Sequence, residues 1–234
     1  MLQEISEKQN ESQIMVATHN NMIASRLNLN NVLWITDDGV KSLSGVDSEV
    51  AKFFVKADDN AFLQLLLSKK VFLVEGATEF LLLPYFYKQL TNHTIEEDGI
   101  SVISCNGISY KKYLAIAENT NKRIAVITDN DGKQKRINEA ETFNQNHDVQ
   151  HVFMGTTTDD WTWEICVYNV NRTVLDGMIN IQAGAKYLFH DKDYGAVPGK
   201  MLNNKVDTAY QMLTSGTVFE VPQYIKDAIV WISK

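Results

Sequence analysis

The chain has 234 residues, of which 44% are hydrophobic and 22% charged, as in ordinary soluble globular proteins. Its 12 glycines and 3 prolines are too few for a collagen-like or Pro/Gly-rich disordered protein. The formal net charge of −7 argues against a protein that coats nucleic acid or an anionic membrane by bulk charge, but not against an enzyme whose carboxylates hold cations.

Cysteine content and hydropathy predict a cytoplasmic protein without a membrane partner. Cys105 and Cys166 are too far apart for a C-x-x-C metal clip, and two isolated cysteines suit a reducing compartment. No apolar run reaches the roughly 18 residues of a membrane span. The first residues are polar and acidic, unlike a signal peptide.

The first 60 residues contain two short apolar runs. Residues 13–17 and 31–36 have strand character and flank a helical stretch, and Asp37-Asp38-Gly39 is a strong turn signal. Residues 40–60 are mixed and polar, so we expect a connection there, followed by a short helix at 61–67.

Strands and helices alternate regularly after residue 70. Apolar runs typical of buried strands lie at residues 71–74, 100–104, 123–128 and 149–154. Helical segments lie between them, at residues 77–90, 110–119 and 133–144. This order predicts an α/β fold with a mainly parallel sheet flanked by helices and joined by right-handed crossovers.

The strand signal fades after residue 157. Four segments there have helical character, at residues 161–167, 171–179, 203–213 and 222–232. We therefore expect a C-terminal helical appendage to the sheet.

Acidic residues follow the first and third strands of this predicted sheet. Glu75 ends the first strand and Glu79 falls in the next helical turn, while Asp129 and Asp131 form a D-x-D after the third strand. Ligands bind at the carboxyl ends of parallel strands, so we expect these acids to lie close together. Their repulsion would require cations, and hard oxygen ligands suit Mg²⁺ or Mn²⁺.

Each acidic motif also has a structural explanation. Glu79 alone suits the positive end of a helix, and Asp-Asn-Asp-Gly alone suits an ordinary turn. Their joint occurrence at two strand ends favours the metal site.

The two motifs together resemble those of the Toprim domain. Val74–Glu79 reads VEGATE and Thr128–Asp131 reads TDND, matching the family pattern of a Glu after the first strand and a D-x-D after the third. Toprim domains occur in bacterial primases, topoisomerases and OLD-family nucleases, and Glu79 as a second acid is similar to the OLD type, to which the Gabija nuclease subunit belongs. The resemblance implies a Toprim-type sheet.

Other stretches resemble the OLD family in particular. The residues before His19 and Asn20 resemble the last strand and His switch of an ABC-type ATPase, which precedes Toprim in this family. Thr162-Trp163-Glu164 resembles the Ser/Thr-x-Glu motif, Lys205 the lysine that opens a late helix, and 221–225 the closing helix. The resemblance implies an ATPase tail and connector at 1–60, a Toprim core at 61–157, and a helical appendage completing the nuclease site at 158–234.

Two features depart from a complete OLD protein. No G-x-x-x-x-G-K-[ST] P-loop occurs, and Asn20 replaces the usual serine of the His-switch stretch. We therefore expect no ATP binding by this chain alone. The expected partners are DNA and the ATPase region of the full-length protein or of a partner chain, with homo-oligomers in the full-length context.

The resemblance implies a site that holds two Mg²⁺ or Mn²⁺ ions. Glu75 and Asp129 would hold or bridge the ions, and Asp131, Glu79 and Glu164 would complete the shell. Such a pair of ions stabilises both the attacking and the departing oxygen in phosphodiester hydrolysis.

A lysine is expected to act beside the ions. Lys205 would supply positive charge to the phosphate in the transition state, and Lys200 is the competing candidate. A solvated lysine at a helix start is the structural alternative for Lys205. Thr162 would contact the metal-binding acids without binding the ions itself.

The one basic concentration of the chain lies between residues 111 and 136, with seven basic residues against three acidic ones. Lys133, Lys135 and Arg136 directly follow the D-x-D and are our candidates for DNA phosphate contacts. A solvated helix face is the alternative.

These features predict a metal-dependent DNA endonuclease, the nuclease part of an OLD-type ATP-dependent endonuclease in phage or foreign-DNA defence. The alternatives are a non-catalytic docking module for an ATPase partner, or a primase-like or topoisomerase-like Toprim activity.

Overall fold

The computed structural model describes residues 15–18, 32–36, 39–42, 61–105, 109–118 and 122–234. They fall into two compact units, one formed by Met1–Lys69 with Ser109–Lys122 and the other by Lys70–Ile108 with Arg123–Lys234. The predicted boundaries at residues 60 and 157 remain predictions. His19, Asn20 and the Asp37-Asp38 turn lie outside the described residues.

Two strands and two helices lie in the described part of the first unit. Strands β1 (Leu33–Thr36) and β2 (Gly39–Ser42) pair in antiparallel fashion, and helix α4 (Ala61–Leu67) contacts helix α6 (Tyr110–Ala117). β2 lies where we expected a connection. The strand expected at 13–17 is wrong where it is described: residues 15–18 do not form a strand, and Met15 is 85% exposed.

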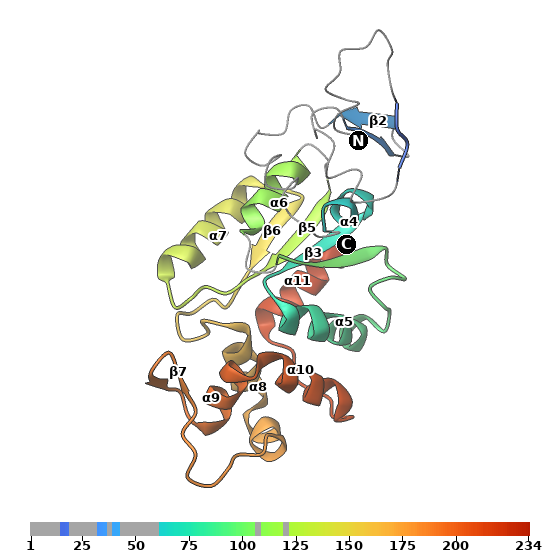
Figure 1. The fold of residues 1–234 in the computed structure, drawn as a ribbon. Coiled ribbons are helices and arrows are strands. Elements are labelled where there is room, and N and C mark those ends of the chain that lie inside the picture. Colours follow the sequence, from blue (N-terminus) through green and yellow to red (C-terminus); the bar gives the residue numbers. More distant parts are fainter. Residues whose placement is uncertain (1–14, 19–31, 37–38, 43–60, 106–108, 119–121) are drawn as a thin grey trace, which may run out of the picture. The chain divides into compact units, whose positions relative to one another are not determined.

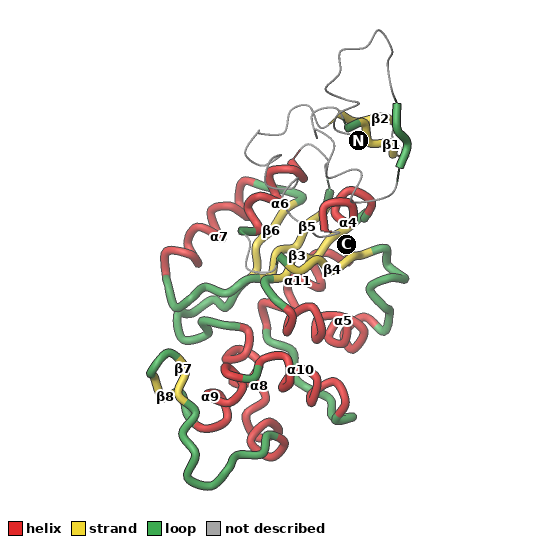
Figure 2. The backbone as a smooth tube through the Cα atoms, viewed as in Figure 1, coloured by secondary structure: helices red, strands yellow, loops and turns green. Residues whose placement is uncertain are grey.

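The second unit is built on a four-stranded parallel sheet of order β4-β3-β5-β6 (Figures 1 and 2). Its strands are β3 (Lys70–Val74), β4 (Ile100–Ser104), β5 (Arg123–Ile127) and β6 (Gln150–Phe153). Each of them lies within one residue of a predicted strand. The predicted α/β fold with a parallel sheet flanked by helices is therefore confirmed.

Helices cover the two faces of this sheet. The β3-to-β4 and β5-to-β6 crossovers run in opposite directions along the sheet, so right-handed connections place α5 (Ala77–Thr91) and α7 (Gln134–Asn146) on opposite faces. Alternate strand residues, among them Phe72, Val74 and Ile127, share one core with α5.

The C-terminal part differs from the four predicted helices. It contains α8 (Trp163–Met178), the hairpin β7 (Leu188–Phe189) and β8 (Lys192–Asp193), α9 (Ala196–Asn203), α10 (Lys205–Thr214) and α11 (Gln223–Ser233). The hairpin and α9 were not expected. Helix α11 is more than an appendage, because it packs on β5 and β6 and completes the core of the sheet.

Helix α8 merges two predicted helices across a kink at Asn171, whose φ of −122° and ψ of 21° are not helical. The buried Asn171 side chain donates to the Val167 carbonyl (2.9 Å) and the Glu220 carbonyl (2.8 Å), and accepts from the Glu220 N–H (2.8 Å). The kink therefore joins α8 to the segment that leads into α11.

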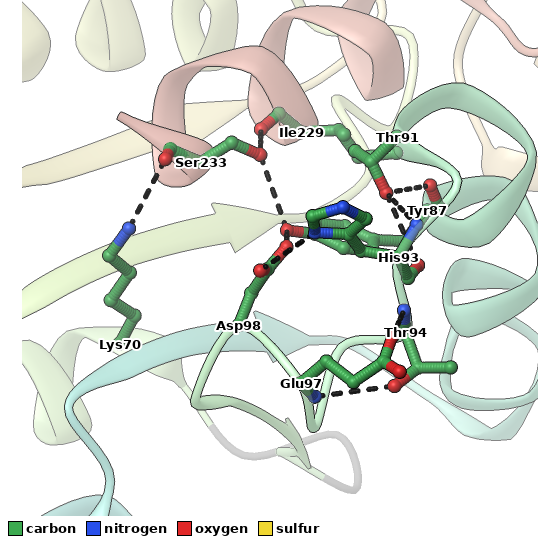
Figure 3. Close-up of polar contacts among 9 residues, drawn as sticks. All are labelled: Lys70, Tyr87, Thr91, His93, Thr94, Glu97, Asp98, Ile229 and Ser233. Carbon is green, nitrogen blue, oxygen red and sulfur yellow. Dashed lines mark hydrogen bonds and ion pairs between the residues drawn. The ribbon is translucent and has the colours of Figure 1, made fainter.

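A polar cluster fastens α11 at the amino-terminal edge of the sheet (Figure 3). The Tyr87 hydroxyl at the end of α5 donates to Asp98 Oδ2 and lies 3.4 Å from Ser233 Oγ, while Lys70 Nζ donates to the Ser233 carbonyl at 3.4 Å. His93 Nδ1 lies 3.2 Å from Asp98 Oδ1. Strand, helix end and C-terminal helix are thus joined here.

Candidate functional site

The two acidic motifs meet because β3 and β5 are neighbours in the sheet. Val74 pairs in register with Ile127, so the residues that follow them emerge side by side. Glu75 Oε2 accepts hydrogen bonds from Thr128 Oγ1 (2.8 Å) and from the Asp129 N–H (3.2 Å). The structure therefore brings Glu75 to the start of the D-x-D, through a hydroxyl that the sequence analysis had not considered.

Glu79 turns back over the start of α5. Its Oε2 accepts from the Gly76 N–H at 3.1 Å, and its side chain is buried, with the residue 6% exposed. Burial raises the pKa of Glu79 to about 8, and the nearby Asp129 and Glu164 carboxylates add to the rise, against the opposing backbone hydrogen bond and Lys205.

Asp129 is held by the start of α8. Its Oδ1 accepts from the Trp163 N–H (2.9 Å) and its Oδ2 from Thr162 Oγ1 (2.7 Å). Burial raises the pKa of Asp129 to about 7; the Thr162 hydrogen bond opposes this rise, and repulsion from Glu75 and Glu164 supports it. The ionised form of Asp129 is therefore only weakly stabilised by the surrounding protein.

Thr162 links Asp129 to the buried Glu164. Thr162 Oγ1 also lies 2.8 Å from Glu164 Oε2, but a hydroxyl has only one hydrogen to donate. Both contacts are satisfied together only when one carboxyl carries a proton. Thr162 thus lies between the Asp129 and Glu164 carboxyls, and its supporting role stays a prediction.

Lys205 opens α10 and pairs with Glu164, with Nζ and Oε2 3.0 Å apart. Burial acts to lower the pKa of Lys205, but attraction to Glu164, Asp129 and Glu79 outweighs it and raises the pKa. Lys200, the competing candidate, instead donates to the Asn180 carbonyl. Of the two lysines, Lys205 is therefore the one that contacts an acid of the site.

The D-x-D loop is anchored by its middle residue, Asn130, which is fully buried and which the sequence analysis passed over. Its Nδ2 lies 2.8 Å from the Gly155 and Thr157 carbonyls and 3.0 Å from the Asp160 carbonyl, and its Oδ1 accepts from the Gly132 N–H (2.7 Å). A Cβ at Gly155 would lie 2.1 Å from the Asp160 carbonyl oxygen, so this packing needs glycine.

Asp131 points to the rim of the site, where its side chain is 45% exposed. Its backbone has a left-handed φ of 53°, and its Oδ2 pairs with Arg136 Nη1 and lies 3.8 Å from Lys133 Nζ. Lys135, in contrast, pairs with Glu139 (3.7 Å) on the exposed side of α7. Of the three predicted phosphate-binding residues, two therefore lie at Asp131 and one does not.

The acids of the site have the oxygen atoms that divalent cations prefer, but their side chains are not arranged around a common point. Among the residues that the structure describes, no three His, Cys, Asp or Glu side chains converge into a ready-made metal site. Their oxygens instead accept hydrogen bonds from Thr128, Thr162 and backbone N–H groups. The donor set nevertheless consists of hard carboxylate oxygens, and the raised pKa values of Glu79 and Asp129 reflect a charge that Mg²⁺ or Mn²⁺ would neutralise.

Part of the chain matches a known protein family. Residues 66–131 match the family model described as "Overcoming lysogenization defect protein-like, TOPRIM domain". The match includes Glu75, Glu79, Asp129 and Asp131. A comparison with curated protein sequences finds no match. Within the described ranges, no helix is both long and apolar enough to cross a lipid bilayer.

A solved structure of an OLD protein region shares the fold of this chain. The C-terminal region of the Burkholderia pseudomallei OLD protein is 19% identical, with a TM-score of 0.53 over 71% of this chain and 98% of that one. The corresponding region from Xanthomonas campestris pv. campestris is 16% identical, with a TM-score of 0.47 over 73% and 94% of the two chains. Residues 66–131 thus match an OLD-like Toprim domain, and the chain has the fold of an OLD C-terminal region.

Proposed function

We propose that this chain is a metal-dependent DNA endonuclease, the nuclease part of an OLD-type ATP-dependent endonuclease that acts in phage or foreign-DNA defence. The observation that carries the proposal is the meeting of Glu75 and Asp129 at two adjacent strand ends, beside Glu79 and Glu164. A domain with a purely structural role would gain nothing from acids whose charges it leaves poorly compensated.

Glu75, Glu79, Asp129 and Glu164 would hold Mg²⁺ or Mn²⁺, with Asp131 at the rim. When bound, a pair of such ions supplies an activated water and stabilises the leaving oxygen of an in-line displacement. Ionised Glu79 and Asp129 are required for binding, so these residues must first release the protons that burial favours.

The cationic side chains would orient the DNA. Lys205 is held at Glu164 by its 3.0 Å ion pair and would direct its charge toward the reacting phosphate. Lys133 and Lys135, both exposed, would contact phosphates beyond the scissile one. We also propose a cytoplasmic location, and the ATPase region of the full-length protein or of a partner chain as its partner.

Plasmid cleavage tests the proposal. The purified chain is incubated with supercoiled DNA and Mg²⁺, Mn²⁺, Ca²⁺ or EDTA, beside Glu75→Ala, Asp129→Ala and the control Asp227→Ala. Asp227 is an exposed acid of α11 that accepts a hydrogen bond from Gln223 (2.8 Å). We expect nicking or linearisation that requires Mg²⁺ or Mn²⁺, persists in the control and disappears in both site variants.

Cleavage that survives EDTA, or both site variants, would contradict the proposal. If the folded wild-type chain cleaves the plasmid with none of the metal ions, it is not an autonomous nuclease. In that case a docking role predicts that Glu75→Ala still binds the ATPase partner.

A further inference from the structure

Arg136 occupies an unusual place among the basic residues beside the site. It lies in the first turn of α7, and its guanidinium pairs with Asp131 through Nη1 while Nη2 donates to Thr128 Oγ1 at 3.3 Å. Thr128 in turn holds Glu75. Arg136 therefore contacts both Asp131 and Thr128, and through Thr128 it is linked to Glu75.

A guanidinium and a divalent cation at one carboxylate repel each other, so a metal ion bound to Asp131 would weaken its ion pair with Arg136. The ion pair at Asp131 is partly exposed, with Arg136 29% and Asp131 45% accessible, so it is weak enough to be displaced. A displaced Arg136 would present a rigid fork of N–H donors, which matches the geometry of a phosphate.

We infer that Arg136 is an exchangeable counter-cation: it neutralises Asp131 before metal binds, and moves to a DNA phosphate when the metal takes its place. This inference rests on the proposed function and adds a coupling between its two ligands. By thermodynamic reciprocity, metal then strengthens DNA binding and DNA strengthens metal binding by the same factor.

Metal affinity without DNA gives the first test. Mn²⁺ is titrated calorimetrically into the full chain, Arg136→Gln, Arg136→Lys and the control Arg172→Gln. Arg172 is an exposed arginine of α8 whose guanidinium lies 5.5 Å from the Tyr168 ring centre. Because the competing charge is gone, Arg136→Gln should bind Mn²⁺ about two- to fivefold more tightly, the fold-change that an exposed ion pair represents. Arg136→Lys should lie between the two, and Arg172→Gln should match the wild type.

DNA affinity gives the second test, measured by fluorescence anisotropy of a labelled duplex in EDTA or Ca²⁺. In EDTA the wild-type Arg136 is engaged by Asp131, so Arg136→Gln should bind DNA as the wild type does. In Ca²⁺ only the wild type should gain the extra contact, and Arg136→Gln should bind several-fold more weakly.

Equal or weaker Mn²⁺ binding by Arg136→Gln would overturn the inference while leaving the nuclease proposal standing. The inference also fails if DNA affinity falls equally in EDTA and Ca²⁺, since Arg136 would then be an ordinary phosphate contact. A folded wild-type chain that binds no Mn²⁺ would overturn both.

Discussion

The two edges of the parallel sheet carry carboxylates in opposite electrostatic situations. At the amino-terminal edge, Asp98 is partly exposed, and the Tyr87 hydroxyl and then His93 hold its pKa below the usual range (Figure 3). At the carboxyl edge, burial raises the pKa values of Glu79 and Asp129 to about 8 and about 7.

The difference teaches how to tell a structural acid from a functional one. Asp98 has donors for both of its oxygens, so its charge helps to hold the fold together. Asp129 also accepts two hydrogen bonds, yet burial and its acidic neighbours leave its charge undercompensated. An acid of that kind is a candidate for a cation from outside the protein.

Exchanging one acid at each edge should separate activity from stability most clearly. Asp129→Asn removes an unfavourable charge while keeping the shape, so cleavage should fall at least about 100-fold with no loss of thermal stability. Asp98→Asn should leave cleavage unchanged and lower the melting temperature. Plasmid assays and calorimetry on both variants decide this, and a fall in melting temperature for Asp129→Asn alone would reverse the comparison.

The packing of the D-x-D loop should be the most sensitive backbone feature of the carboxyl edge. Gly155→Ala would place a Cβ 2.1 Å from the Asp160 carbonyl oxygen. We therefore expect the unfolding free energy to fall by about 2 kcal/mol or more, and DNA cleavage to be lost as well. Gly177→Ala, in α8 with open space around it, should instead gain up to about 1 kcal/mol. Urea denaturation measures both; similar values for the two would mean that the loop relaxes freely.

The pH dependence of stability should have opposite signs at the two edges. Glu79 and Asp129 have folded pKa values above their ordinary 4.5 and 3.8, so the native state holds more protons than the unfolded one, and their contribution is lost as pH rises from about 4 toward 8. Asp98 has a lowered pKa, so its contribution is present above pH 3.8 and is lost as pH falls through its folded value.

Magnesium should therefore raise the melting temperature more at pH 8 than at pH 6, because the ligands proposed for it, Glu79 and Asp129, are then ionised. Calorimetry with Mg²⁺ or EDTA at both pH values checks this, with Asp129→Asn as the variant that should lose the response. A larger rise at pH 6 would contradict the assignment.

Removing the donor at the amino-terminal edge should have the smallest effect. Tyr87→Phe deletes the hydroxyl that binds Asp98 and contacts Ser233, and should lower the unfolding free energy by about 1 kcal/mol without affecting cleavage. Chemical denaturation beside a plasmid assay tests it, and a loss of activity would show that the two edges are coupled.

The parallel sheet was predictable because its strands are buried on both faces and read as continuous apolar runs. Once the strands were placed, register brought Glu75 to Asp129, since strand ends meet at one edge of a sheet. The hairpin at 188–193 was not predictable, because two-residue strands have no periodicity to detect. Helix α9 was obscured by Pro198, which its first turn tolerates.

Side-chain pairing within the site was beyond the sequence. In the sequence, Arg136 is indistinguishable from the other basic residues of its helix. It meets Asp131 because of the left-handed backbone at Asp131 and the position at which α7 begins. The hydroxyl of Thr128 and the amide of Asn130 likewise gain their partners from loops distant in the chain.

Because β3 and β5 pair in register, the length of the chain that connects them can vary. The separation of Glu75 and Asp129 in space is set by the lateral spacing of neighbouring strands, about 4.8 Å, and not by the number of residues that join the strands. Loop closure costs grow only slowly with length, so this connection can lengthen or shorten with little effect on the site. Proteins that share the site should then differ widely in the distance between their two acidic motifs, and searches for them should score the motifs separately from the gap.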